Sequence, residues 1–131
     1  MRFTAIAFVA LSALHVAWGR GSAIPFRSRL ELADSVVGTA DVPPPAACYA
    51  VAVALIGAAA LVIDAPIAPR SIRRLGRHIV TSVLATRASV GLVGRTDLLV
   101  PGSVSPRFRR LDRLCFAPLC AALAVGTAAA N

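Results

Sequence analysis

Residues 46–63 form an uninterrupted apolar segment, AACYAVAVALIGAAALVI. None of these eighteen residues is charged, and the Tyr49 hydroxyl is the only strong hydrogen-bonding group among their side chains. As an α-helix, at about 1.5 Å per residue, the segment is roughly 27 Å long, close to the thickness of a bilayer's hydrocarbon core. Proline occupies residues 43–45, and Asp64 and Pro66 follow, as expected at helix boundaries. The segment predicts a transmembrane helix.

The composition of the whole chain fits a single membrane domain, residues 1–131. Hydrophobic residues make up 57% of the chain and its mean hydropathy is +0.75, more than a soluble domain of this size needs. The net charge is +8, and every basic residue apart from the two histidines is Arg. These arginines occur in short runs between apolar segments, as in loops that contact anionic lipid headgroups. We therefore expect the lipid bilayer as a partner and no binding of nucleic acid.

Three further apolar segments, near residues 3–19, 78–95 and 114–130, bring the number of predicted spans to four. The sequence thus predicts an all-α fold, an integral membrane four-helix bundle. The first segment is short and follows Arg2, so a cleaved signal peptide is the alternative interpretation of it.

The third predicted span contains Arg87 near its middle. An Arg at that depth costs about 2.5–3.5 kcal/mol on an insertion scale, whereas each Ile, Leu or Val gains roughly 0.3–0.6 kcal/mol. We therefore expect this helix to insert together with its neighbours, with Arg87 turned toward protein or water. Its expected contact is with the first or the last helix, where His15 and Asp112 are the candidate partners.

A short interfacial helix is predicted before the last span. Ser105 is a residue type that caps helices, and proline, here Pro106, is favoured in a first turn. Beyond them, apolar side chains share one face and arginines occupy the others. This pattern is typical of a helix that lies at a membrane surface.

Four spans would place both termini on one side of the membrane and the longer loops on the other. Near that second side we expect a polar cluster of His15, Arg87, Asp97 and Asp112, with Trp18 as an anchor in the headgroup region. His15 is either a ligand or proton carrier, or a neutral side chain hydrogen-bonded to a carbonyl or to Asp112. Arg87 either binds an anion or headgroup, or forms an internal pair that fixes helix packing.

No catalytic or metal-binding motif is recognisable in the sequence. The three cysteines, Cys48, Cys115 and Cys120, lack metal-ligand spacing and are most simply small apolar residues. We find no phosphate-binding loop, zinc-protease or nucleophile-elbow pattern. The sequence therefore predicts no metal, no cofactor and no enzymatic activity.

Several short blocks resemble a known family. They are LHVAW at residues 14–18, TRASVG at 86–91, SPRFRRLDR at 105–113 and FAPLC at 116–120. In this order they resemble the domain of unknown function 3995, a family of small bacterial four-helix integral membrane proteins. The family usually has Tyr before the Trp and Tyr-Ser before Pro-Leu-Cys, where this chain has Ala17 and Phe116-Ala117. The resemblance implies four spans, with the first retained, in the inner (plasma) membrane, and it implies no activity.

Three hypotheses for function follow. The first is a non-enzymatic membrane component that binds another membrane protein. The second is a small carrier, or a binder of anions or lipid headgroups, centred on Arg87. The third is a redox or cofactor-binding protein that uses His15. The membrane orientation stays open. Arginines favour the cytoplasmic side, and the side with both termini has five whereas the other side has eight. The densest run, at residues 70–77, nevertheless lies on the side with the termini.

Overall fold

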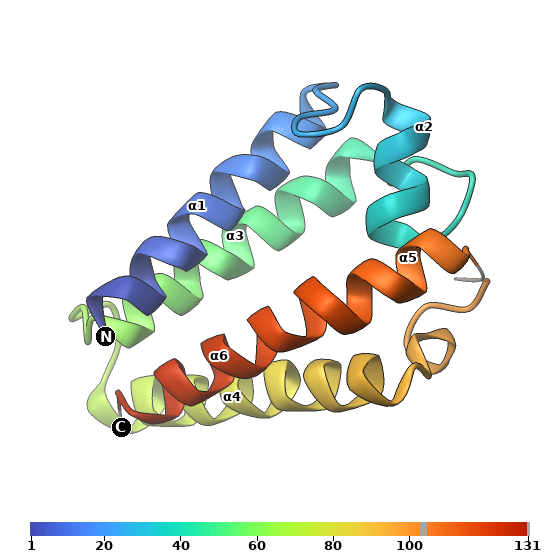
Figure 1. Ribbon diagram of the computed structural model, residues 1–131. Coiled ribbons are helices and arrows are strands. Elements are labelled where there is room, and N and C mark those ends of the chain that lie inside the picture. The colour runs from blue at the N-terminus through green and yellow to red at the C-terminus, as the bar shows by residue number, and fades with distance from the viewer. Residues whose placement is uncertain (103–104, 131) are drawn as a thin grey trace.

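The computed structural model describes residues 1–102 and 105–130, and all regular secondary structure in these residues is helical. Four helices are long, and two short helices connect them (Figure 1). The long helices are α1 (Arg2–Gly19), α3 (Pro45–Val62), α4 (Arg70–Val93) and α6 (Ala117–Ala128), and the short ones are α2 (Arg29–Leu32) and α5 (Pro106–Leu111). Two π-helical turns, η1 (Ala33–Val37) and η3 (Asp112–Phe116), and one 3₁₀ turn, η2 (Thr96–Leu98), complete the described elements.

Among the described residues, three helical segments are long and apolar enough to cross a membrane, which supports the membrane class. They are α1, α3 and the continuous helix from Pro106 to Ala128. The longest helix, α4, has 24 residues but is not among them, because arginines and other polar residues along it lower its hydropathy. It begins at Arg70, well before the predicted start near residue 78. The arginine run at residues 70–77, expected between two spans, is therefore part of the helix.

The predicted interfacial helix is not a separate element. Helix α5 begins as predicted, with the Ser105 hydroxyl accepting the backbone N–H of Phe108 at 3.4 Å. It then continues through the π turn η3 into α6 without a break. Pro118, which lacks an N–H and crowds the preceding turn of an α-helix, follows this wider turn directly. The π turn lets the helix accommodate the proline instead of ending there.

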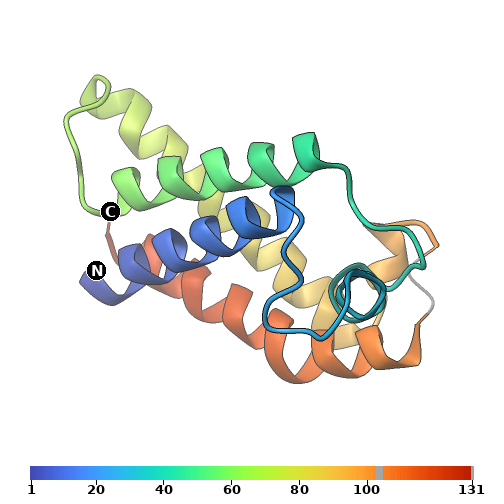
Figure 2. The ribbon, with the colours of Figure 1, turned by 90° about the horizontal axis from the view of Figure 1, so that it is seen from above.

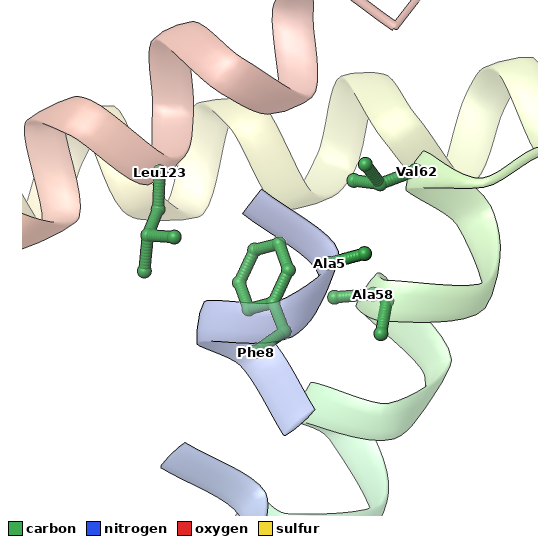
Figure 3. Packing of buried hydrophobic residues seen from close by; sticks show 6 residues of the cluster. Ala5, Phe8, Ala58, Val62 and Leu123 are labelled. Atoms are coloured by element: carbon green, nitrogen blue, oxygen red, sulfur yellow. The ribbon is translucent and has the colours of Figure 1, made fainter. Parts of the chain in front are cut away.

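The long helices form two pairs: α1 packs mainly along α3, and α4 mainly along α6 (Figures 1 and 2). The pairs meet at the end where α1 begins and α6 ends. Figure 3 shows Phe8, which is 1% exposed, inserted there among small or branched side chains of α1, α3 and α6. The cluster contains Ala5, Phe8, Ala58, Ala59, Val62 and Leu123. Alanines at the contact let the helix backbones approach closely.

At the opposite end the two pairs diverge, and α2 with η1 lies between them (Figure 1). This connector packs on α5: Gly38 ends η1 with a φ of 82°, and a Cβ there would lie 2.7 Å from the Phe108 ring. Glu31 on α2 also pairs with Arg107 on α5 at 2.7 Å. The connector therefore joins the α1–α3 pair to the α4–α6 pair at the end where the two pairs no longer contact each other.

Candidate functional site

An ion pair between Arg87 and the buried Asp112 joins α4 to η3, the turn that leads into α6. Arg87 Nη2 lies 2.5 Å from Asp112 Oδ1, and the Thr96 hydroxyl donates to Asp112 Oδ2. The Asp112 side chain is 1% exposed, and that of Arg87 is 26% exposed. Three elements, α4, η2 and η3, thus place their polar groups around one carboxylate.

Gly91 makes this contact possible. It lies one turn after Arg87 on α4, and a Cβ at this position would lie 2.7 Å from the Cβ of Ala117 and 2.9 Å from Asp112 Oδ2. Ala117 itself is completely buried. Because neither residue carries a larger side chain, α4 and α6 approach closely enough for Asp112 to reach Arg87.

The Arg87–Asp112 pair holds the helices in register. Both carboxylate oxygens of Asp112 are engaged, Oδ1 by Arg87 and Oδ2 by Thr96. Arg87 Nη1 is buried and has no hydrogen-bond partner among the described residues. A buried pair of this kind adds little net stability, but removing either partner leaves an expensive uncompensated charge. The arrangement is that of an internal structural pair.

The structure does not gather the other predicted cluster members at this pair. His15 Nδ1 lies 2.8 Å from the Leu11 carbonyl, on the α1–α3 side of the molecule. Asp97 pairs loosely with Arg95, with 3.6 Å between Nε and Oδ1, and its side chain is 42% exposed. Of the four residues, Arg87 and Asp112 are thus in contact, whereas His15 lies on α1, which packs mainly along α3.

His15 and Trp18 instead lie beside a cavity of about 140 Å³ at the diverging end. Trp18 is only 8% exposed, and its indole N–H donates to the Ile24 carbonyl at 2.6 Å. Its indole is thus covered largely by the protein itself, and its role as an anchor in the headgroup region stays a prediction. The ring centroids of His15 and Trp18 are 4.8 Å apart. The cavity lies between α1, α3 and the connector, and its lining residues are His15, Trp18, Arg29, Leu32, Val36, Val37, Val42, Pro43, Ala47, Cys48 and Val51.

Arg29 is a lining residue that the sequence analysis missed. Its Nη1 donates to the carbonyls of Trp18 at 3.0 Å and Ser22 at 3.2 Å, which ties α2 to the end of α1. The missed signal was Ser28-x-x-Glu31, a helix-start pattern. In the structure the Ser28 hydroxyl accepts the Glu31 N–H at 3.1 Å, which fixes α2 and the position of Arg29.

The end of the molecule near the termini carries a second group of charges. Asp64, whose φ is 55°, accepts Arg77 Nη1 at 2.9 Å and Arg73 Nε at 3.0 Å. These two guanidinium groups, Arg77 foremost, hold the pKa of Asp64 below its usual value. The contact closes the turn between α3 and α4 and explains why α4 extends back to Arg70.

Within residues 1–102 and 105–130, no group of three or more His, Cys, Asp or Glu side chains is arranged to hold a metal ion. The three cysteines are free thiols: Cys48 is buried, Cys120 is half-buried and Cys115 is exposed.

Comparison with known proteins assigns a family without an activity. The model of a family described as a protein of unknown function, DUF3995, matches residues 8–127. No curated protein and no solved structure matches the chain. Because the match covers most of the sequence, the chain belongs to this family.

Proposed function

We propose that this member of the DUF3995 family is a non-enzymatic, four-span component of the bacterial inner membrane that binds a transmembrane helix of another membrane protein through α4. The observation that carries the proposal is a polar stripe on the outward side of α4. Its residues are exposed and follow one another at spacings of three or four: Ser71, Arg74, His78, Ser82, Thr86 and Ser89. Such spacing places them on one face of the helix.

This stripe is poorly suited to contact lipid. A charged side chain within the hydrocarbon region is expensive, and polar side chains in spans usually face protein or water. The outward side of α3 is the opposite case, because its exposed residues, including Val51, Val53 and Ile56, are apolar. We infer that lipid covers α3 and that a partner helix covers α4, where Ser, Thr and His side chains form hydrogen bonds between helices.

The geometry favours partner binding over a carrier or anion site centred on Arg87. A carrier or anion site centred on Arg87 would need a guanidinium free to change partners, but Nη2 already contacts the buried Asp112. His15 lies away from α4, beside a cavity between α1, α3 and the connector, so a role for this residue is a separate question from the partner of α4.

Photo-crosslinking in membranes of the native host tests the proposal. A photoreactive residue at Ser82 is expected to give a discrete adduct with another membrane protein, whereas the same residue at Val53, which is 73% exposed on α3, is expected to give none. Adding Ser82→Leu to a chain carrying the photoreactive residue at His78 should weaken the adduct. Equal adducts from Val53, or none from positions 78, 82 and 89, would contradict partner binding. An adduct with the mass of two copies of this chain would replace the proposed partner by a second copy.

A further inference from the structure

The cavity beside His15 has the dimensions and lining of a site for one small ring. Its volume of about 140 Å³ is close to that of an engineered cavity of about 150 Å³ that binds benzene. Leu32, Val36 and Val51 contribute apolar walls, and Trp18 contributes an aromatic one. Apolar walls with a few polar groups are the usual composition of a small-molecule site.

Two polar side chains reach this cavity, and each offers a different hydrogen-bonding function. His15 Nδ1 is 2.8 Å from the Leu11 carbonyl, and a carbonyl can only accept. In the neutral ring Nδ1 therefore carries the proton, which leaves Nε2 as an acceptor. Both hydrogen bonds of Arg29 come from Nη1, so among the described residues Nε and Nη2 have no acceptor. Arg29 supplies donors to a ligand, and His15 supplies an acceptor.

We infer that this cavity binds a phenol or hydroquinone ring. A hydroxyl on the ring can donate to His15 Nε2, and a hydroxyl oxygen can accept from Arg29, while the ring fills the apolar space beside Trp18. A quinone ring without a hydroxyl cannot donate to Nε2 and is disfavoured. The inference concerns the α1–α3 end of the molecule and does not depend on the proposed partner of α4.

Two sources of such a ring share this chemistry. One is a membrane hydroquinone with a long apolar tail, and the other is a free phenolic compound. The cavity lies at the ends of α1 and α3, which belong to the helices long and apolar enough to cross a membrane. A ligand could thus arrive from the bilayer or from water.

Fluorine NMR of 4-fluorophenol, titrated with the purified full-length protein in lipid nanodiscs, tests the inference directly. We expect saturable line broadening. Ala47→Leu, which puts a larger side chain into the cavity, should weaken binding by about tenfold or more, since each tenfold corresponds to only about 1.4 kcal/mol. Ala50→Leu is the matched control, because Ala50 is exposed on the same helix and does not line the cavity, so it should bind as the parent does.

The hydrogen bond is tested separately. 4-Fluorotoluene has nearly the same size as 4-fluorophenol but no hydroxyl, so it should bind more weakly. His15→Phe should lower affinity for 4-fluorophenol about fivefold, the value of one typical hydrogen bond, without lowering that for 4-fluorotoluene. Broadening that never saturates, or that is the same for parent and Ala47→Leu, would mean partition into lipid only and would overturn the site. Equal affinity of the parent for both rings would overturn the assigned hydroxyl contact.

Competition identifies the source. A hydroquinone with a ten-carbon tail that displaces 4-fluorophenol at much lower concentration than tail-free hydroquinone would identify a membrane hydroquinone. Equal displacement by both would identify a free phenolic compound. Failure of both to displace 4-fluorophenol would contradict the hydroquinone class.

Discussion

The two helix pairs of this protein are held together by different interactions. Between α1 and α3 the contacts are alanines, larger apolar side chains such as Phe8 and Val62, and a hydrogen bond from Ser12 to the Ala52 carbonyl at 2.9 Å. Between α4 and the last helix a buried ion pair, Arg87–Asp112, lies at the contact beside Gly91. The first pair is apolar enough to insert by itself. The second contains a helix that needs its neighbours, because its charge is compensated only by tertiary contact.

The largest expected effect is at Asp112. Asp112→Ala leaves Arg87 without its carboxylate, and breaking a buried pair in this way costs about 3–5 kcal/mol. The thermal unfolding midpoint of the purified protein in detergent measures the loss. Asp97→Asn is the control, since Asp97 is exposed and its pair with Arg95 is loose. Replacing both Arg87 and Asp112 by Leu should restore much of the stability, because no unpaired charge remains. If Asp112→Ala had the same unfolding midpoint as Asp97→Asn, the α4–α6 pair would not depend on its ion pair, and the contrast with the α1–α3 pair would be lost.

Glycine substitutions sharpen the comparison. Gly91→Ala places a methyl group 2.7 Å from Ala117 Cβ, so α4 and α6 must move apart. Overpacking of this kind costs about 1–3 kcal/mol. Gly57→Ala is the matched change on α3, where nothing lies within 4 Å of the new Cβ. It should raise stability by up to about 1 kcal/mol, because Ala favours the helix over Gly. Unfolding midpoints that shift in the same direction would show that Gly91 is not a contact point.

Ser12 tests the apolar pair. Its hydroxyl joins α1 to α3, and hydrogen bonds between helices in membranes contribute about 0.6 kcal/mol on average. Ser12→Ala should therefore shift the unfolding midpoint only slightly. Ser89→Ala, which removes a hydrogen bond within α4 alone, should have no larger effect. A loss comparable to that of Asp112→Ala would mean that the first pair also depends on a polar contact.

The smallest effect concerns the connector between the pairs. The backbone N–H of Arg27 and, next, the side chain of Arg107 hold the pKa of Glu31 below its ordinary value of 4.5. Because the folded state lowers this pKa, the contact stabilises the protein fully above pH 4.5 and loses its effect as pH falls through the lowered pKa. Unfolding midpoints of parent and Glu31→Gln should therefore differ at neutral pH and converge in acid. Asp64 titrates in the same direction, so only the difference between the two proteins is informative.

The sequence by itself determined the elements whose signals are local. Helix α3 spans Pro45–Val62 against a prediction of 46–63, because uninterrupted apolar residues end at prolines and a charge. Helix α1 agrees closely because its mostly apolar run lies between Arg2 and Arg20, and Ser105 caps α5 as its position before Pro106 predicts. The family was likewise identifiable from four short blocks of residues. A helix boundary depends on neighbours within a few residues, so the sequence contains it.

Only the tertiary structure decided which helices pair and which polar groups meet. The sequence offered Arg87 two candidate partners, His15 as the nearer in depth and Asp112 as a compensating charge from nearer the surface. Because α1 packs on α3, His15 lies away from Arg87. Because α4 and α6 approach closely at Gly91, Asp112 lies within reach of Arg87. The cavity beside Trp18 has the same origin, since α1, α3 and the connector each contribute part of its wall. Contacts of this kind join residues far apart in the chain, and their geometry depends on side-chain volumes at the crossing, which no local pattern specifies.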